Sequence, residues 1–431
     1  MTLRDEATAL LQALLRLNTV NPPGNETIAA QLLRDYLARN GVEAELYART
    51  SGRANLVARI KGGDGPSLAF LGHTDTVLAD PAEWRRDPWS GELVDGEIWG
   101  RGALDMKDQV AASAVAFASL AREGFEPTGD LLFIAVADEE VGGTDGFGLV
   151  WLVDEHPEAV RCDYAINEGG GDRLLLGGSP VYLCATAEKM SAPFTIRVHG
   201  RSGHASMPGI ADNALVKAAR YVEALGAYEP PLELIPEAKA LFEAVLGEIP
   251  PLEHALARAS RAGPTLPALL EPQLAFTLSP TMIDASHQRN VIPALCEVGV
   301  DCRLLPETVP ADIEPLIRAV LGNGGYELEF DEAIGGTRSP LDTPLWDVLE
   351  RFAADLEPGA RLAPVACAGF TDSHYLRESF GTVAYGFFPL RTMDALEATR
   401  LVHSADERIP VDDLELGVSF LRFTARSLLG S

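Results

Sequence analysis

The chain has 431 residues, more than one hydrophobic core usually organises, so we expect two domains. Hydrophobic residues make up 47% of the chain and charged residues 23%, which excludes a protein dominated by disorder. The 63 acidic against 35 basic side chains give a net charge of −28, and no run of Lys and Arg exceeds two residues, which argues against a nucleic-acid-binding protein.

The cysteines and the apolar segments indicate where the protein resides. Five scattered cysteines without a Cys-x-x-Cys pair predict neither a disulfide framework nor a thiolate metal site. No apolar segment typical of a signal peptide follows the N-terminus, and no uninterrupted apolar stretch reaches the roughly 18 residues of a membrane helix. We therefore expect a cytoplasmic protein that binds neither membranes nor nucleic acid.

The first part of the chain alternates predicted helices with short apolar strands. Amphipathic helices are predicted over residues 3–17 and about 26–40, and an alanine-rich helix over residues 109–122. Short apolar strands, typical of strands buried on both faces, are predicted over residues 55–60, 67–72, 131–137 and 164–167. Strands separated by helices predict an α/β sheet with helices on both faces.

The pattern changes after about residue 186 and resumes after Pro306. Between these points, an alternating strand, a helix and a second strand indicate a smaller α+β domain. We predict a larger domain formed by residues 1–186 and 307–431, with a smaller domain, residues 187–306, inserted into it. The proline-containing stretch 229–272 shows no pattern from which its structure can be predicted.

Two polar motifs follow or precede predicted elements of the first part. His73 and Asp75 come directly after a buried strand, at the sheet edge where open α/β sheets bind ligands. His73 can offer a ring nitrogen to a metal ion while Asp75 fixes its tautomer, although an ordinary polar turn is also compatible. Asp105 lies in a glycine-rich loop just before a helix, where it is a candidate metal ligand or a helix cap, with Asp108 an equally good cap.

Three further motifs add carboxylates and a histidine. Asp138, Glu139 and Glu140 end a buried strand, and three adjacent carboxylates repel one another unless a cation or protons offset them. Adjacent glutamates point in different directions, so one can bind a metal while the other faces a water molecule. Glu168 follows the next strand, and His403 precedes the last helix. Taken alone, each of the two acidic motifs is also compatible with a solvated turn, and His403 is also compatible with a structural role.

The five candidate ligands are His73, Asp105, Glu140, Glu168 and His403. Histidine and carboxylate donors without cysteine suit Zn²⁺, and Mn²⁺ or Co²⁺ could substitute. Five such ligands with one bridging carboxylate could hold two ions roughly 3.5–4 Å apart.

In the order and spacing of these motifs, the sequence resembles a family of co-catalytic di-zinc metallopeptidases and deacylases. This family includes aminoacylase, carboxypeptidase G, acetylornithine deacetylase and succinyl-diaminopimelate desuccinylase, and the resemblance covers almost the whole chain. It implies that the larger domain is a zinc-peptidase-like catalytic domain with a mixed sheet flanked by helices. It also implies that the inserted domain, residues 187–306, is a lid that often mediates dimerisation. It also implies two divalent metal ions and hydrolysis of an amide bond in a short peptide or an N-acyl amino acid.

The resemblance implies a role for each candidate. Asp105 would bridge the two ions, with His73 and Glu168 completing one site and Glu140 and His403 the other. Asp75 would orient His73. Glu139 would act as the general base that activates water and protonates the leaving amine.

Residues of the predicted lid, and Gly369 in a later loop, are assigned roles in the same way. His204 in Gly203-His204-Ala205 would stabilise the oxyanion, in some relatives from the partner subunit. Asn290, Arg303 and Gly369 would line the substrate pocket, although an internal salt bridge is an equally open role for Arg303. The chain departs from the family at Met190, where the family commonly has glycine, and over residues 229–272.

Two other functions remain open alongside amide hydrolysis. A two-metal phosphoesterase uses similar ligands, but the acidic balance of the chain argues against it. A catalytically inactive binding homologue should have lost ligands or the base, whereas this chain retains the whole set. The sequence does not separate peptidase from deacylase.

Overall fold

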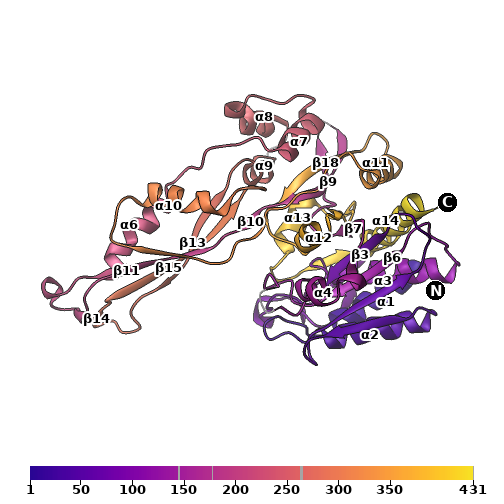
Figure 1. The fold of residues 1–431 in the computed structure, drawn as a ribbon, viewed down its shortest axis with the longest axis horizontal. Helices are drawn as coiled ribbons and strands as arrows, with labels where there is room; N and C mark the ends of the chain where they lie inside the picture. The colour runs from indigo at the N-terminus through magenta and orange to yellow at the C-terminus, as the bar shows by residue number, and fades with distance from the viewer. Residues whose placement is uncertain (144–145, 177, 263–265, 431) are drawn as a thin grey trace.

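The structure, a computed structural model, describes residues 1–143, 146–176, 178–262 and 266–430. Within these ranges the strands form two main sheets, one of nine strands and one of six. The nine-stranded sheet and its helices form one unit, and the six-stranded sheet forms an elongated second unit that extends away from it (Figure 1). We call them the first and the second unit.

The nine-stranded sheet is mixed. Its strands follow the order β1 (Ala44–Ala48), β2 (Ala54–Ile60), β6 (Leu131–Val136), β3 (Leu68–His73), β7 (Tyr164–Asn167), β19 (Val383–Gly386), β9 (Ser179–Glu188) and β18 (Arg361–Cys367), with β8 (Arg173–Leu176) paired to β9. Strand β3 runs parallel to both of its neighbours, β6 and β7, whereas β1 and β2 are antiparallel. The predicted mixed α/β sheet is confirmed.

Helices cover both faces of this sheet. One face packs against α1 (Leu3–Leu15), α2 (Thr27–Arg39), α3 (Lys107–Arg122), α11 (Pro344–Leu356), α13 (Ala395–Leu401) and α14 (Val411–Leu429). The other face packs against α4 (Leu149–Glu155), α5 (Pro157–Val160) and α12 (Ser373–Phe380). Within β3, Leu68 and Phe70 point to the first core and Ala69 and Leu71 to the second, which explains its continuous apolar sequence.

A small sheet completes the first unit. Strand β5 (Glu97–Trp99) pairs with β4 (Glu92–Val94) and with β20 (Arg408–Pro410), so two segments far apart in the chain meet there. The short helix η1 (Pro81–Glu83) precedes this sheet. No helix in the described ranges combines the length and the apolar character that a membrane crossing requires.

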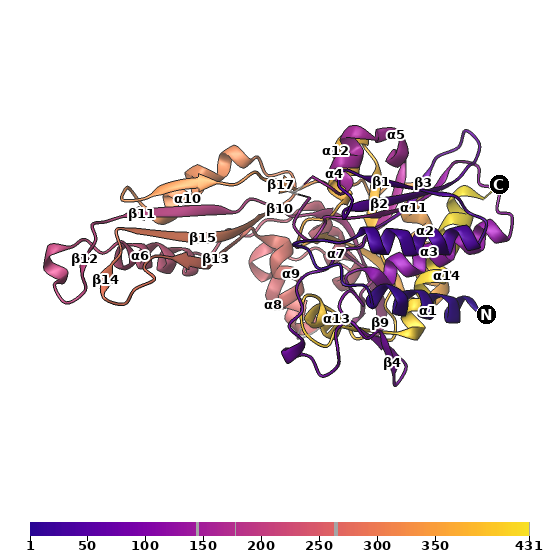
Figure 2. The ribbon, with the colours of Figure 1, turned by 90° about the horizontal axis from the view of Figure 1, so that it is seen from below.

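The second unit is an antiparallel sheet covered by helices. Its strands follow the order β16 (Glu327–Phe330), β11 (Phe194–His199), β15 (Leu295–Leu304), β10 (Met190–Ser191) and β17 (Ile334–Gly335), with β13 (Thr277–Asp284) paired to β15. Helices α6 (Ala214–Gly226) and α10 (Ile313–Leu321) share its core. The unit also contains η2 (Pro208–Ile210), η4 (Pro310–Asp312) and the strand pair β12 (Gly203–His204) and β14 (Val291–Ile292). That pair lies at the end of the unit farthest from the nine-stranded sheet (Figure 2).

Helices make up much of the described part of the stretch that the sequence left unassigned. It contains α7 (Pro236–Leu246), η3 (Leu252–His254), α8 (Ala255–Ala262) and α9 (Leu266–Leu274). These helices form a separate core with β9 and β18, so this stretch packs on the first unit. The Gln273 side chain donates to the backbone oxygen of Ala366 and accepts from its backbone nitrogen, both at 2.6 Å.

The pairing of strands also bears on the predicted limits of the inserted domain. Strands β16 and β17 follow residue 306 in the chain, yet both pair within the second sheet. The second sheet therefore draws strands from both sides of the predicted boundary.

Candidate metal centre

Three neighbouring parallel strands bring the candidate ligands of the first part together. Strand β3 ends at His73, β6 ends at Val136 just before Glu139 and Glu140, and β7 ends at Asn167 just before Glu168. Because β3 runs parallel to β6 and β7, the carboxyl ends of the three strands meet at one edge of the sheet.

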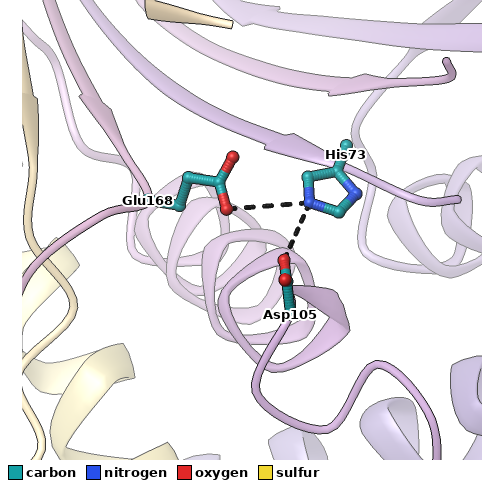
Figure 3. Close-up of side chains that lie close together, drawn as sticks. All are labelled: His73, Asp105 and Glu168. Carbon is teal, nitrogen blue, oxygen red and sulfur yellow. Dashed lines mark hydrogen bonds and ion pairs between the residues drawn. The ribbon is translucent and has the colours of Figure 1, made fainter. Parts of the chain in front are cut away.

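His73, Asp105 and Glu168 form the first group of donors (Figure 3). The Nε2 atom of His73 lies 3.1 Å from Oδ1 of Asp105 and 3.7 Å from Oε2 of Glu168. On the other side of the ring, Nδ1 lies 3.1 Å from the backbone oxygen of Asp75. The ring therefore presents Nε2 to the two carboxylates.

Asp105, Glu140 and His403 form the second group. The Nε2 atom of His403 lies 2.9 Å from Oδ2 of Asp105 and 3.2 Å from Oε2 of Glu140. The two oxygens of Asp105 thus face different histidines, which is the arrangement of a bridging ligand. Helix α3 begins after Met106 without a side-chain N-cap hydrogen bond, so Asp105 is not a helix cap.

The buried carboxylates in and beside the two groups fit divalent cations. Burial raises the pKa of Glu139 well above its ordinary value, and the nearby Glu168 adds to the shift. Burial also raises the pKa of Glu140 to about 7, because the hydrogen bond from His403 only partly offsets burial and the nearby Asp105. Both carboxyls are buried among other acidic groups, an environment that a divalent cation would offset, and histidine and carboxylate donors suit Zn²⁺, Co²⁺ or Mn²⁺.

Asp75 and Glu139 lie beside the two groups rather than in them. The Asp75 side chain is fully buried and lies 3.6 Å from Nδ1 of His73, while it accepts from the backbone nitrogens of Glu139 at 3.3 Å and Glu140 at 3.1 Å. The Oε2 atom of Glu139 lies 3.9 Å from Nε2 of His73. Glu140 is turned the other way, and its Oε1 accepts from the backbone nitrogen of Val77 at 3.1 Å. The adjacent glutamates therefore have different surroundings.

The remaining predicted residues lie outside this cluster. His204 is exposed on β12, and its Nδ1 atom lies 2.8 Å from the hydroxyl of Ser206. Asn290 lies close to His204, because the backbone oxygen of Asn290 accepts a hydrogen bond from the backbone nitrogen of Ala205. The structure brings these two together at the far end of the second unit, away from the ligands. Arg303 on β15 pairs with Asp301 at 3.0 Å, the internal salt bridge that the sequence left open.

The loop that carries Gly369 lies at the junction of the two units. Glu188, the last residue of β9, accepts from both the backbone nitrogen and the hydroxyl of Thr371 at 3.0 Å. Glu188 also accepts from the Thr337 hydroxyl at 2.6 Å. Asp372, next in this loop, is buried, and its pKa is raised well above the ordinary value by burial, opposed by His73. The loop is thus tied to the junction on one side and approaches the centre on the other.

A buried polar network behind the centre was not predicted from the sequence. Arg53 pairs with Glu26 at 2.7 Å and with Asp138 at 2.9 Å, and all three side chains are almost fully buried. The Asn21 amide donates to Asp75 at 2.9 Å and to Asp138 at 3.3 Å. The network therefore holds the segment before Glu139 and Glu140, and the only sequence signal near it is the break at Asn21-Pro22-Pro23-Gly24.

Replacing Arg53 with Met should lower the free energy of unfolding by about 3–5 kcal/mol, because two buried carboxylates lose their shared cation. Arg59→Met is the matched control, since Arg59 forms a partly exposed ion pair with Asp130 and its loss should cost about 1 kcal/mol or less. Urea unfolding followed by circular dichroism measures both. Equal stability losses in the two variants would contradict the importance of the buried network.

Both the sequence and the fold of the chain are similar to those of known proteins. The model of peptidase family M20/M25/M40 matches residues 69–427. The chain is 28% identical over 424 residues to succinyl-diaminopimelate desuccinylase of Cereibacter sphaeroides, covering 95% of each chain. It is 27% identical over 376 residues to the N-fatty-acyl-amino acid synthase/hydrolase PM20D1 of Xenopus tropicalis, covering 84% of this chain and 73% of that protein. The fold matches the M20 family metallo-carboxypeptidase Sso-CP2 of Sulfolobus solfataricus with a TM-score of 0.75 and 18% identity, over 98% of this chain and 99% of that one.

Proposed function

The chain belongs to peptidase family M20/M25/M40, and we propose that it is a two-metal hydrolase that cleaves the amide bond of an N-acyl amino acid. The observation that carries the proposal is the position of Asp105, whose two oxygens face His73 and His403 in two adjoining groups of donors. The family match confirms the resemblance seen in the sequence and its expectation of a hydrolase acting on carbon–nitrogen bonds.

The names of the two sequence relatives support a deacylase ahead of a peptidase. One is named for removal of a succinyl group from diaminopimelate, and the other for synthesis and hydrolysis of N-fatty-acyl amino acids. Both names describe an acyl group on an amino-acid nitrogen. We therefore place N-acyl amino acids first among the substrates and short peptides second.

The proposed ligands divide into two sites that share Asp105. His73 and Glu168 would hold one ion and Glu140 and His403 the other, with Zn²⁺ first and Co²⁺ or Mn²⁺ as substitutes. When bound, such ions polarise a substrate carbonyl and favour deprotonation of water at neutral pH.

The residues of the chain supply the rest of the mechanism. Glu139 lies beside both groups without belonging to either, so its carboxylate is placed to take a proton from the attacking water and give it to the leaving nitrogen. Asp75 accepts the backbone N–H groups of Glu139 and Glu140 and so fixes the direction of both side chains. Because Asp75 also lies beside Nδ1 of His73, it holds the ring with Nε2 toward the ligands.

We further propose that the second unit is a lid that forms a homodimer. Large apolar side chains that are exposed in the monomer gather in this unit, a distribution that favours an interface between proteins. They are Met207, Ile210, Leu215, Val216, Met282, Ile283, Val291 and Leu295. In this proposal the inserted domain extends to Gly335 of β17, and Arg303, Asn290 and Gly369 contact the substrate.

A cytoplasmic location belongs to the same proposal. All five cysteines are unpaired, which suits a reducing compartment.

Removal of metal should abolish hydrolysis, and addition of Zn²⁺, Co²⁺ or Mn²⁺ should restore it. Elemental analysis of the reloaded protein should find about two ions per chain. A parallel screen of N-acyl amino acids and dipeptides tests the substrate class, and faster hydrolysis of the N-acyl amino acids is expected. Full activity after exhaustive chelation, with no metal detected in the protein, would overturn the two-metal proposal.

A further inference from the structure

One buried carboxylate, that of Glu407, holds the loop that carries the shared ligand. Its side chain is 0% exposed, and each of its two carboxylate oxygens accepts two hydrogen bonds. Oε1 accepts from the backbone nitrogens of Leu104 at 2.7 Å and Asp105 at 3.0 Å. Oε2 accepts from the backbone nitrogen of Gly102 at 3.0 Å and from the Arg101 side chain at 2.6 Å. The loop thus directs its amides to a single side chain.

Strand pairing brings this carboxylate to the loop and links it to the second histidine. Arg408 of β20 pairs with Trp99 of β5, and the backbone nitrogen of Gly100 donates to the backbone oxygen of Glu407 at 3.0 Å. His403 lies on the same short segment, between α13 and β20. Glu407 therefore connects the segment of one proposed ligand to the loop of another.

The donors around Glu407 offset part of the cost of burying its charge. Burial raises the pKa of this carboxyl, whereas Arg101 and the backbone amides of Leu104 and Gly102 oppose the shift. The carboxylate accepts four hydrogen bonds, from the Arg101 guanidinium and from three backbone amides. In Glu407→Gln, the NH₂ group that replaces one oxygen would face N–H donors and could not accept their hydrogen bonds.

We propose that Glu407 is a positioning residue that fixes Asp105 relative to His403 and thereby sets the affinity of the chain for its metal ions. The inference rests on the proposed function, because it takes Asp105 and His403 as ligands. Residues that orient metal ligands without touching the metal typically change affinity or activity 10- to 100-fold when replaced.

The chain offers a matched control for this role in Asp413. Asp413 is also buried, and it accepts from three backbone nitrogens, those of Arg391, Thr392 and Met393. The loop that it holds carries none of the proposed ligands. Asp413→Asn therefore removes a similar anchor from a different place.

The test compares Glu407→Gln and Asp413→Asn in the full-length chain. Titration of the metal-stripped proteins with Zn²⁺ by calorimetry should show affinity lower by about 10- to 100-fold in Glu407→Gln and near the wild-type value in Asp413→Asn. Thermal unfolding of the metal-free proteins should show lower stability in both variants. A purely structural role would lower stability without this difference in affinity.

Wild-type Zn²⁺ affinity in folded Glu407→Gln would overturn the inference, and so would an equal loss in Asp413→Asn. Should Glu407→Gln fail to fold, Glu407→Asp keeps the charge opposite Arg101 but reaches less far, and it should bind Zn²⁺ more weakly than the wild type. Unchanged affinity in Glu407→Asp would then overturn the inference. A wild-type chain that binds no divalent ion would overturn the proposed function itself, so the wild-type titration tells the two failures apart.

Discussion

Replacing Glu139 with Gln is expected to lower kcat by about 10²- to 10⁴-fold, the usual contribution of a general base, while the metal ions stay bound. The amide has nearly the same shape as the carboxylate but cannot accept and return a proton. Glu139 belongs to neither group of donors, so its replacement should leave the ligands in place. Steady-state kinetics and elemental analysis of the same preparation measure the two effects.

The neighbouring residue provides the control for this prediction. Glu140→Gln alters an oxygen that lies 3.2 Å from His403 within the second group, so this variant should lose metal as well as activity. The same substitution at adjacent positions should therefore give different metal contents. Wild-type turnover in Glu139→Gln would refute the assignment of the base, and loss of metal from it would make Glu139 a ligand instead.

Replacing His204 with Ala should lower kcat by about 10²- to 10³-fold if this side chain stabilises the developing oxyanion. Strand β12, which carries His204, lies at the end of the second unit farthest from the nine-stranded sheet (Figure 2). We therefore expect His204 to serve the centre of the partner subunit in the proposed dimer.

A mixed dimer tests this expectation directly. Co-expression of His204→Ala and Glu139→Gln chains with different tags allows the heterodimer to be purified. Its His204→Ala chain has an intact centre and receives His204 from the partner, so about half of the wild-type activity should return, one competent site of two.

A heterodimer of Glu139→Gln and Glu140→Gln chains is the control, because both of its centres carry a lesion and neither can recover. Absence of recovery in the first heterodimer, with each variant inactive alone, would place His204 in its own chain's centre. Full activity of His204→Ala alone would remove this residue from the mechanism.

The proposed ligands could be predicted from the sequence because strand ends mark them. His73, Glu140 and Glu168 each follow a short apolar segment, and such segments become the buried strands β3, β6 and β7. Their meeting at one sheet edge follows from the parallel arrangement that alternating helices and strands predict. The structure also excludes Asp105 as the cap of α3, an alternative that the sequence left open.

The residues that support the ligands could not be predicted in this way. Glu407 and Asp105 are 302 positions apart, and the partners of Glu407 are mostly backbone amides. A backbone amide has no residue type, so no motif marks the side chain that accepts its hydrogen bond. Arg53 and Glu26 are hidden for a related reason, since a charged residue in the sequence does not reveal that it is buried.

The helices α7 and α9 could not be predicted from the sequence because prolines obscure their helical periodicity. Pro236 lies in the first turn of α7 and Pro272 lies inside α9, where proline normally interrupts a helix. The end of the inserted domain was hard to place because β16 and β17 are short and return to the second sheet only after α10. Neither feature leaves a strong periodic signal.

The hydrogen bonds between Gln273 and Ala366 have a consequence for how the protein behaves in a crowded solution. Strand β18 is the last strand on its side of the nine-stranded sheet, and an open edge of this kind can recruit a strand from another molecule. The Gln273 amide satisfies both backbone groups of Ala366, as a neighbouring strand would, and α7, α8 and α9 share a core with β18. Gln273 and the helices α7, α8 and α9 thus cover this edge, and they should hinder the addition of a strand from another molecule.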